Sequence, residues 1–335
     1  MGIVISREER LMFINMEKLA VVFPGQGSQR AGMGKDFHDS SAVARNTFEE
    51  ASDVLGWDVP AMCFNENEKL HLTEYAQPCI LATEIAMYRM IRSEFQISPS
   101  FFGGHSLGEY TALVAADALS FQDALVVVRE RGRLMQEASP VGSGAMTAVI
   151  GENLSADAIQ KALENLPVDI ANINSSQQIV ISGHADSMDT AVMRIQSALP
   201  SSDGLRFVPL NVSAPFHSHF MNTIKDRFQA VLNQVPEGIH PENAEKVTSN
   251  YTGVFHTSSS REIVQKLVEQ LSNTVRWKDN MNLISQKASQ VFEIGPNRPL
   301  RKFFQTIGVN CFSVTTYSSA MREFQNRKPD DTIQQ

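Results

Sequence analysis

The sequence is poor in cysteine and contains no long apolar segment. Its three cysteines, Cys63, Cys79 and Cys311, are odd in number and scattered along 335 residues. This pattern argues against a disulfide framework or a zinc cluster and suits a reducing compartment. No apolar run approaches the roughly 18 residues that a membrane-spanning helix needs. Residues 1–17 lack the apolar core of a signal peptide, so we expect a cytoplasmic protein.

Basic residues are also in the minority. The chain has 29 lysines and arginines against 37 aspartates and glutamates, which gives a formal net charge of −8. This excludes the strongly basic surface of a nucleic-acid-binding protein, although a local basic pocket for an anionic substrate remains compatible with it. Hydrophobic residues make up 42% of the chain, enough apolar surface to offset the entropy of chain ordering. The length predicts two domains, or one α/β unit with an insertion.

Short apolar runs alternate with helical patterns along most of the chain. Strands are predicted at 18–24, 100–104, 246–249 and 290–295, and helices at 75–95, 107–117, 121–138, 219–234, 260–273 and from 298 onward. Ser120 is the predicted N-cap of the helix at 121–138, with Asp123 as its third residue. Strands that alternate with helices indicate a mainly parallel sheet that is covered on both faces.

The middle of the chain has a different character. Strands are predicted at 145–150, 168–172, 178–182 and 206–210, with helices near 155–165 and 185–199. This β-α-β-β-α-β order is typical of a ferredoxin-like α+β subdomain. We therefore predict an α/β-hydrolase-like catalytic domain with an inserted subdomain, and an active site in the cleft between the two. The predicted boundaries are 1–17 for an N-terminal extension, 18–141 and 212–320 for the catalytic domain, 142–211 for the subdomain and 321–335 for a polar tail.

The segment Gly104-His-Ser-Leu-Gly108 is the strongest local signal of chemistry. It fits the pattern G-x-S-x-G and lies where a predicted strand turns into a predicted helix. Such a turn needs small residues on both sides of the serine and leaves the Ser106 hydroxyl exposed at the edge of the sheet. The Leu107 N–H, at the start of the helix, would then point toward an oxyanion beside Ser106. A glycine-rich turn with a serine cap is the alternative, and the strand–helix context favours a nucleophile.

A serine nucleophile needs a base, and the chain has eight histidines. Spacing alone does not choose among them. His217 and His219 lie in a proline-containing loop that returns from the inserted subdomain, which is a reasonable position for a catalytic histidine. The glycine-rich loop at 23–29 is open to three interpretations. It lacks the residues of a phosphate-binding P-loop, so an oxyanion-hole N–H or a tight βα turn fits better.

Several motifs then occur in one order along the chain. They are the loop at 23–29, the segment 104–110, Arg131-Gly in a helix that ends near 138, Asn172-x-Asn-Ser175, Pro215-Phe-His217 and Glu293-Ile-Gly-Pro296. Together they resemble the malonyl-CoA:acyl carrier protein transacylases, a family that includes the acyltransferase domains of polyketide synthases. The resemblance runs from about Leu19 to about Thr315, nearly the whole chain.

The resemblance implies a role for each matching residue. Ser106 would be the nucleophile, and His217 rather than His219 the catalytic histidine. The backbone N–H groups of Gln26 and Leu107 would form the oxyanion hole. The implied substrate-binding residues are Arg131, Phe216 and His105. The backbone carbonyl of Gln270 would orient the catalytic histidine. Arg131 would bind the free malonyl carboxylate, since a guanidinium matches a carboxylate at two points. The bulky Phe216 directly before His217 resembles the residue that malonyl-selective synthase domains have at this position. Its size leaves little room for an α-methyl group.

The implied reaction transfers a malonyl group from malonyl-CoA to the phosphopantetheine thiol of an acyl carrier protein, through an ester on Ser106. Extender units for polyketide or fatty acid synthesis are the implied product. The expected partner is a discrete or synthase-embedded carrier protein, and no metal, other cofactor, nucleic acid or membrane is implied. One competing hypothesis is an acyl hydrolase that strips carrier proteins, for which Arg131 would serve no purpose. A second is an unrelated serine esterase, which would need an acidic residue and then a histidine after the serine, and a third is a non-catalytic scaffold.

Overall fold

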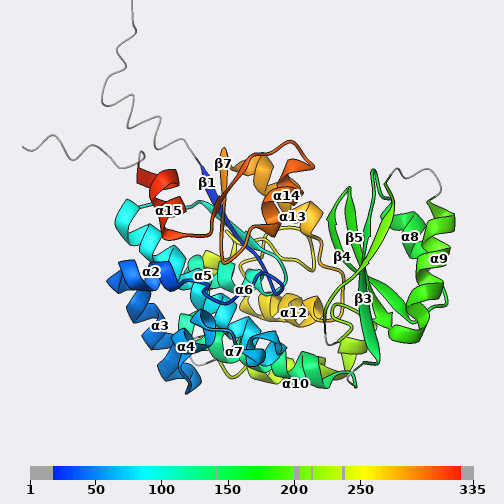
Figure 1. Cartoon of the computed structure of the whole chain (residues 1–335), viewed down its shortest axis with the longest axis horizontal. Coiled ribbons are helices and arrows are strands. Elements are labelled where there is room, and N and C mark those ends of the chain that lie inside the picture. The colour runs from blue at the N-terminus through cyan, green and yellow to red at the C-terminus, as the bar shows by residue number, and fades with distance from the viewer. Residues whose placement is uncertain (1–17, 141, 200–203, 213, 236–237, 326–335) are drawn as a thin grey trace, which may run out of the picture.

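A computed structural model describes residues 18–140, 142–199, 204–212, 214–235 and 238–325 (Figure 1). The predicted extension at 1–17 and the last ten residues of the predicted tail, 326–335, lie outside the described residues. The described chain forms a larger unit around a parallel sheet and a smaller unit around an antiparallel sheet, which Figure 1 shows in green. Among the described residues, no helix is both long and apolar enough to cross a membrane.

The larger unit is built on four parallel strands in the order β2-β1-β7-β8. Their bounds are Leu19–Phe23 for β1, Phe101–Gly104 for β2, Gln290–Ile294 for β7 and Cys311–Val314 for β8. Because side chains alternate along a strand, the apolar run of β1 is buried on both faces. Val21 and Phe23 pack against one helical layer, and Ala20 and Val22 pack against another.

Helices cover both faces of this sheet. On the side of Val21 lie α5 (Thr73–Phe95), α6 (Gly108–Ala115) and α7 (Phe121–Glu137), and on the side of Val22 lie α13 (Trp277–Lys287) and α14 (Pro299–Gln305). Ser120 caps α7 by accepting a hydrogen bond from Asp123 N–H, as predicted. The remaining helices of the larger unit are α2 (Lys35–Ser40), α3 (Ala42–Leu55), α4 (Val59–Phe64), η1 (Glu68–His71), η3 (His219–Ile224), α10 (Lys225–Leu232), α11 (Pro241–Ala244), α12 (Ser260–Gln270) and α15 (Tyr317–Phe324).

The smaller unit has the predicted ferredoxin-like order. Its elements are β3 (Gly144–Ile150), α8 (Ala156–Ala162), β4 (Val168–Ser175), β5 (Gln178–His184), α9 (Met188–Ala198) and β6 (Arg206–Pro209). The strands pair antiparallel in the order β4-β5-β3-β6, and both helices pack on one face of this sheet around Ile159, Ile181 and Ile195. The predicted fold class, an α/β unit with an inserted ferredoxin-like unit, is confirmed.

Backbone hydrogen bonds fasten the smaller unit to the larger one. Ile173 N–H of β4 donates to the Val275 carbonyl at 3.0 Å, and Val275 N–H donates to the Ala171 carbonyl at 2.8 Å. Val275 lies two residues before the start of α13, so β4 is held against the edge of the larger unit. The two units therefore share a fixed boundary where a cleft can form.

The structure differs from the sequence prediction at several elements. No strand forms at 246–249, because Val247 and Thr248 make only isolated bridges before the chain turns at Gly253. The predicted helix at 219–234 is split into η3 and α10. Helices α2 to α4, strand β8 and helix α15 were not predicted. Helix α15 continues past residue 320, and its Phe324 is fully buried, so the described chain shows no break at the predicted start of the tail.

Candidate active site

Ser106 lies on a sharp turn between β2 and α6. Its φ angle of 53° is in the left-handed region, which a non-glycine residue adopts only when its surroundings hold it there. Ser106 N–H donates to Asn250 Oδ1 at 2.6 Å and anchors the turn. A Cβ atom at Gly104 would lie 2.0 Å from the Gly108 carbonyl oxygen, and one at Gly108 would lie 2.2 Å from the Phe23 carbonyl oxygen. The two glycines of the motif are therefore required by close backbone contact.

His217 is the histidine that the fold brings to Ser106. Its Nε2 lies 2.8 Å from Ser106 Oγ, and its Nδ1 lies 2.8 Å from the Gln270 carbonyl oxygen. Because a carbonyl only accepts, Nδ1 carries the proton and Nε2 is free to accept one from the serine. His219 lies elsewhere, half exposed and paired with Asp169 at 2.6 Å. The structure thus places His217, and not His219, beside Ser106.

Burial and a neighbouring cation both oppose protonation of His217. Its side chain is almost fully buried, and desolvation together with the charge of Arg131 lowers its pKa to about 3. The hydrogen bond to the Gln270 carbonyl acts in the opposite direction but is outweighed. His217 is therefore neutral near pH 7, in the form that can act as a base.

Arg131 points into the same site from the middle of α7. The residue is 1% exposed, and its Nη2 donates to Ser106 Oγ at 3.0 Å and to Gln270 Oε1 at 2.8 Å. Its Nη1 donates to Gln77 Oε1 at 3.0 Å, and its Nε has no hydrogen-bond partner among the described residues. Desolvation lowers the pKa of this guanidinium, since burial is its main perturbation. A buried cation with a donor to spare is suited to receive an anion.

The neighbouring arginines of α7 face outward instead. Arg129 lies over the Trp57 ring and 3.6 Å from a Glu74 oxygen, and Arg133 pairs with Glu130 at 2.7 Å. Both are more than one-third exposed. Only Arg131 of these three points into the site.

The loop after β1 packs against the serine turn. A Cβ at Gly25 would lie 2.3 Å from the His105 carbonyl oxygen, so only glycine allows this approach. Next to it, the Gln26 side chain bonds Thr73 Oγ1 at 3.2 Å and accepts from Gln77 Nε2 at 3.3 Å. Leu107 is buried at the start of α6. Gln26 lines the same cavity as Ser106, and Leu107 directly follows Ser106 in the chain.

A cavity of about 560 Å³ joins these residues to the smaller unit. Gln26, His105, Ser106, Arg131, Phe216 and His217 all line it, so it gathers most of the predicted site residues. The opposite wall comes from β3, β4 and β5 and includes Met146, Ala148, Asn172, Asn174, Gln178 and Val180. His105 Nε2 lies 2.7 Å from Asn174 Oδ1 and so links the two walls. The cavity lies at the predicted position, between the two units.

Sequence reasoning missed several residues that organise the site. Gln77, Glu109 and Asn250 are fully or almost fully buried, and each hydrogen-bonds a predicted site residue or its backbone. The signal for Glu109 was present, since it lies in the motif at 104–110, but nothing in the spacing indicated what it contacts. Asn250 follows the predicted strand at 246–249, and only the tertiary fold brings it to Ser106.

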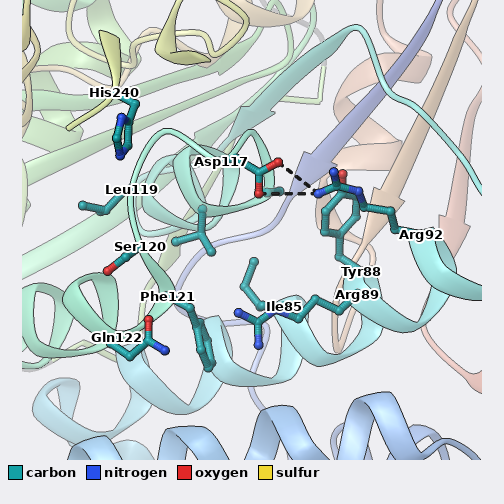
Figure 2. Close-up of a pocket in the computed structure, with 12 residues that line it drawn as sticks. Ile85, Tyr88, Arg89, Arg92, Asp117, Leu119, Ser120, Phe121, Gln122 and His240 are labelled. Carbon is teal, nitrogen blue, oxygen red and sulfur yellow. Dashed lines mark hydrogen bonds and ion pairs between the residues drawn. The ribbon is translucent and has the colours of Figure 1, made fainter. Parts of the chain in front are cut away.

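A second cavity, of about 310 Å³, contains none of the predicted site residues (Figure 2). It lies between α5, the turn after α6 and the start of α7. Arg92 pairs with Asp117 at 3.1 Å, as the dashed lines mark, and Arg89 pairs with Glu50 at 2.6 Å. Since both guanidinium groups already have carboxylate partners, this cavity is less suited to bind an anion than the cavity at Ser106. Among the described residues, no cluster of three or more histidine, cysteine or acidic side chains could hold a metal ion.

Comparison with known proteins places this geometry in a family. The family model described as "Acyl transferase domain" matches residues 20–303. The malonyl CoA-acyl carrier protein transacylase of Bacillus subtilis (strain 168) is 40% identical over 295 residues, which cover 85% of this chain and 89% of the relative. The enzyme of the same name from Escherichia coli (strain K12) is 37% identical over 290 residues, which cover 85% and 91%.

Solved structures agree with the sequence relatives. An acyl carrier protein S-malonyltransferase from Vibrio cholerae has a TM-score of 0.83 and 34% identity, and the match covers 91% of this chain and 99% of that one. A type II polyketide synthase acyl carrier protein in complex with its malonyl-transacylase gives a TM-score of 0.83 and 34% identity over 92% and 99%. The chain belongs to the acyl transferase family, among the malonyl CoA-acyl carrier protein transacylases.

Proposed function

We propose that this protein transfers a malonyl group from malonyl-CoA to the phosphopantetheine thiol of an acyl carrier protein, through an ester on Ser106. One observation carries the proposal: a buried guanidinium, Arg131, donates to the hydroxyl of a serine that also bonds a histidine. A nucleophile and a carboxylate-binding group within one cavity suit an acyl group that ends in a free carboxylate. The names of the relatives describe the same reaction.

In the first half-reaction Ser106 Oγ attacks the thioester carbon of malonyl-CoA. His217 Nε2, 2.8 Å away, takes the hydroxyl proton. The carbonyl oxygen becomes an oxyanion, for which we assign the N–H groups of Gln26 and Leu107 as donors. The loss of one such donor typically costs about 2.7–4 kcal/mol of transition-state stabilisation. The intermediate collapses, the C–S bond breaks, and the CoA thiolate receives the proton from His217.

In the second half-reaction the thiol of the carrier protein attacks the malonyl ester. His217 now takes the thiol proton and returns it to Ser106 Oγ as the ester C–O bond breaks. The Gln270 carbonyl keeps the imidazole in the required tautomer through the proton on Nδ1. A carbonyl stabilises the imidazolium less than a carboxylate would, so the dyad is suited to a reactive thioester substrate.

The bound malonyl group would also change the site electrostatically. The positive charge of Arg131 is one of the causes of the low pKa of His217. A malonyl carboxylate on Arg131 offsets this positive charge and so favours the imidazolium that forms during the reaction. An acetyl group brings no such charge. This argument supports Arg131 as the residue that selects the substrate.

Phe216 is proposed to restrict the substituent on the acyl group. It is 7% exposed, directly precedes His217 and lines the cavity. A large ring at this position leaves little space for an α-methyl group, which favours malonyl over methylmalonyl. We propose a role in polyketide or fatty acid synthesis with no resident cofactor. We also propose a cytoplasmic location, supported by three cysteines that are all free and buried.

The test is a transfer reaction followed by mass spectrometry. The protein is mixed with malonyl-CoA and a phosphopantetheinylated carrier protein, and malonyl-carrier and free malonate are measured over time. Malonyl-carrier should appear much faster than malonate. If neither product appears and the protein instead strips an acyl-loaded carrier, the protein is a hydrolase and the argument from Arg131 is wrong.

A further inference from the structure

A fully buried carboxylate lies behind the site and contacts none of the reacting groups directly. Glu109 is 0% exposed and lies in the first turn of α6, three residues after Ser106. Its Oε2 accepts from Asn250 N–H at 3.0 Å and from Gln270 Nε2 at 2.7 Å, and its Oε1 lies 2.9 Å from His256 Nε2. A buried carboxylate with this many donors is held in one orientation.

Gln270 links this carboxylate to three residues of the site. Its backbone carbonyl accepts from His217 Nδ1, and its side-chain Oε1 accepts from Arg131 Nη2 at 2.8 Å. Its side-chain Nε2 donates to the Ser106 carbonyl at 3.0 Å as well as to Glu109. The side-chain amide therefore lies between Arg131, which only donates, and two oxygens that only accept.

The amide of Gln270 can satisfy these neighbours in one orientation alone. If it were flipped, its NH₂ group would face the Arg131 guanidinium and its oxygen would face the Glu109 carboxylate and the Ser106 carbonyl. Donor would then meet donor, and acceptor would meet acceptor, within a buried region where unpaired polar groups are costly. The carboxylate at 109 is thus one of the groups that fix which end of the amide faces Arg131, and it makes the shorter of the two hydrogen bonds from Gln270 Nε2.

We propose that Glu109 is a positioning residue for substrate selection. It fixes the side-chain amide of Gln270, and Gln270 in turn holds the Arg131 guanidinium in the orientation that receives the malonyl carboxylate. The inference rests on the proposed function, because it assigns Glu109 to the same acyl site. Its action is through hydrogen-bond geometry, so an acceptor at position 109 is required and a charge is not.

Two substitutions separate geometry from charge. In Glu109→Gln the amide oxygen can still accept from Asn250 N–H and Gln270 Nε2, while its NH₂ group faces His256. His256 can accept this hydrogen after moving its own proton to Nδ1, which has no partner among the described residues. Glu109→Met has a similar length but accepts nothing. Glu109→Gln should keep the preference of the parent for malonyl-CoA over acetyl-CoA, and Glu109→Met should lose it.

The experiment measures kcat/KM for acyl-enzyme formation with malonyl-CoA and with acetyl-CoA. Glu109→Met should lower the malonyl-to-acetyl ratio about tenfold or more, the size expected for a lost hydrogen bond to a charged group, mainly through the KM of malonyl-CoA. The matched control is Glu84→Met, which removes another fully buried glutamate that contacts Thr111 and not Gln270, and it should leave the ratio unchanged. A merely structural role of Glu109 would slow both substrates alike.

A double-mutant cycle tests whether the effect passes through Gln270. In a Gln270→Met background, Glu109→Met should cause no further fall in the ratio. The proposal is overturned if Glu109→Met lowers the malonyl-to-acetyl ratio by the same factor in the Gln270→Met background as in the parent. It is also overturned if Glu109→Gln lowers this ratio as far as Glu109→Met does.

If Glu109→Met does not fold, as judged by its thermal melt, Glu109→Asp replaces it. The shorter side chain keeps a buried carboxylate but withdraws it from Gln270 Nε2, so the ratio should fall. If the parent protein forms no malonyl-enzyme, the proposed function itself is wrong. If the parent forms it but the ratios do not change as expected, only the inference about Glu109 is wrong.

Discussion

Arg131→Ala should change which acyl group the enzyme accepts. A malonyl carboxylate in the cavity would meet a guanidinium that is 1% exposed, so little water competes for it. One hydrogen bond to a charged group contributes about 1.5–3 kcal/mol, and two would contribute at least about 3 kcal/mol. At about 1.4 kcal/mol per tenfold change, the loss in kcat/KM for malonyl-CoA should exceed about a hundredfold.

Acetyl-CoA serves as the internal reference for this substitution. The bond from Arg131 to Ser106 Oγ concerns both substrates, so its loss cancels in the malonyl-to-acetyl ratio. The ratio therefore reports what depends on the malonyl carboxylate, which is its contact with Arg131 and its offset of the charge that lowers the pKa of His217. The assay measures acyl-enzyme formation with each CoA ester, with Arg133→Ala as the control because Arg133 lies on the same helix and pairs with Glu130. A malonyl-to-acetyl ratio close to that of the parent would refute the reasoning and remove Arg131 from the malonyl site.

Three further predictions follow from single side chains. Phe216→Ser should raise kcat/KM for methylmalonyl-CoA relative to malonyl-CoA, and an unchanged ratio in the same assay would contradict the steric argument. Because the pKa of His217 is lowered to about 3, kcat/KM for malonyl-CoA should stay level as the pH falls from 8 to about 5, whereas a fall centred near 6.5 would show an ordinary histidine. Burial raises the pKa of Glu293 to about 7, so the folded protein holds a proton that the unfolded chain releases near pH 4.5, and stability is lost as the pH rises through 7. Urea titrations at pH 5 and pH 8 measure how far the free energy of unfolding falls between these two pH values. In Glu293→Gln this fall should be smaller than in the parent by about 2–3 kcal/mol, and an equal fall in the two proteins would refute the argument.

The sequence predicted the parts of the fold whose signals are local. The sharp turn between the strand and the helix around Ser106 requires glycine at 104 and 108, because a side chain at either position would clash with neighbouring backbone. The ferredoxin-like unit was visible because its strands and helices alternate within one short segment. The prediction of a strand at 246–249 was wrong, because a short apolar run does not show whether a neighbouring strand pairs with it over its whole length.

The site was predicted less completely than the fold. Only the family resemblance separated His217 from His219 and Arg131 from Arg129 and Arg133, since these residues are similar in type and near in sequence. Tertiary structure explains the difference: His217 and Arg131 are buried beside Ser106, whereas His219 pairs with Asp169 at the surface. The role of the Gln270 side chain could not be foreseen, because it depends on contacts between segments that are far apart in the chain.

The central claim is that a malonyl ester forms on Ser106, and mass spectrometry of the protein after brief exposure to malonyl-CoA tests it most directly. The parent should gain the mass of one malonyl group, peptide mapping should place that group on Ser106, and addition of a phosphopantetheinylated carrier protein should remove it. Ser106→Ala should gain no such mass. A malonyl adduct that persists in Ser106→Ala, or that maps to another residue in the parent, would contradict the account.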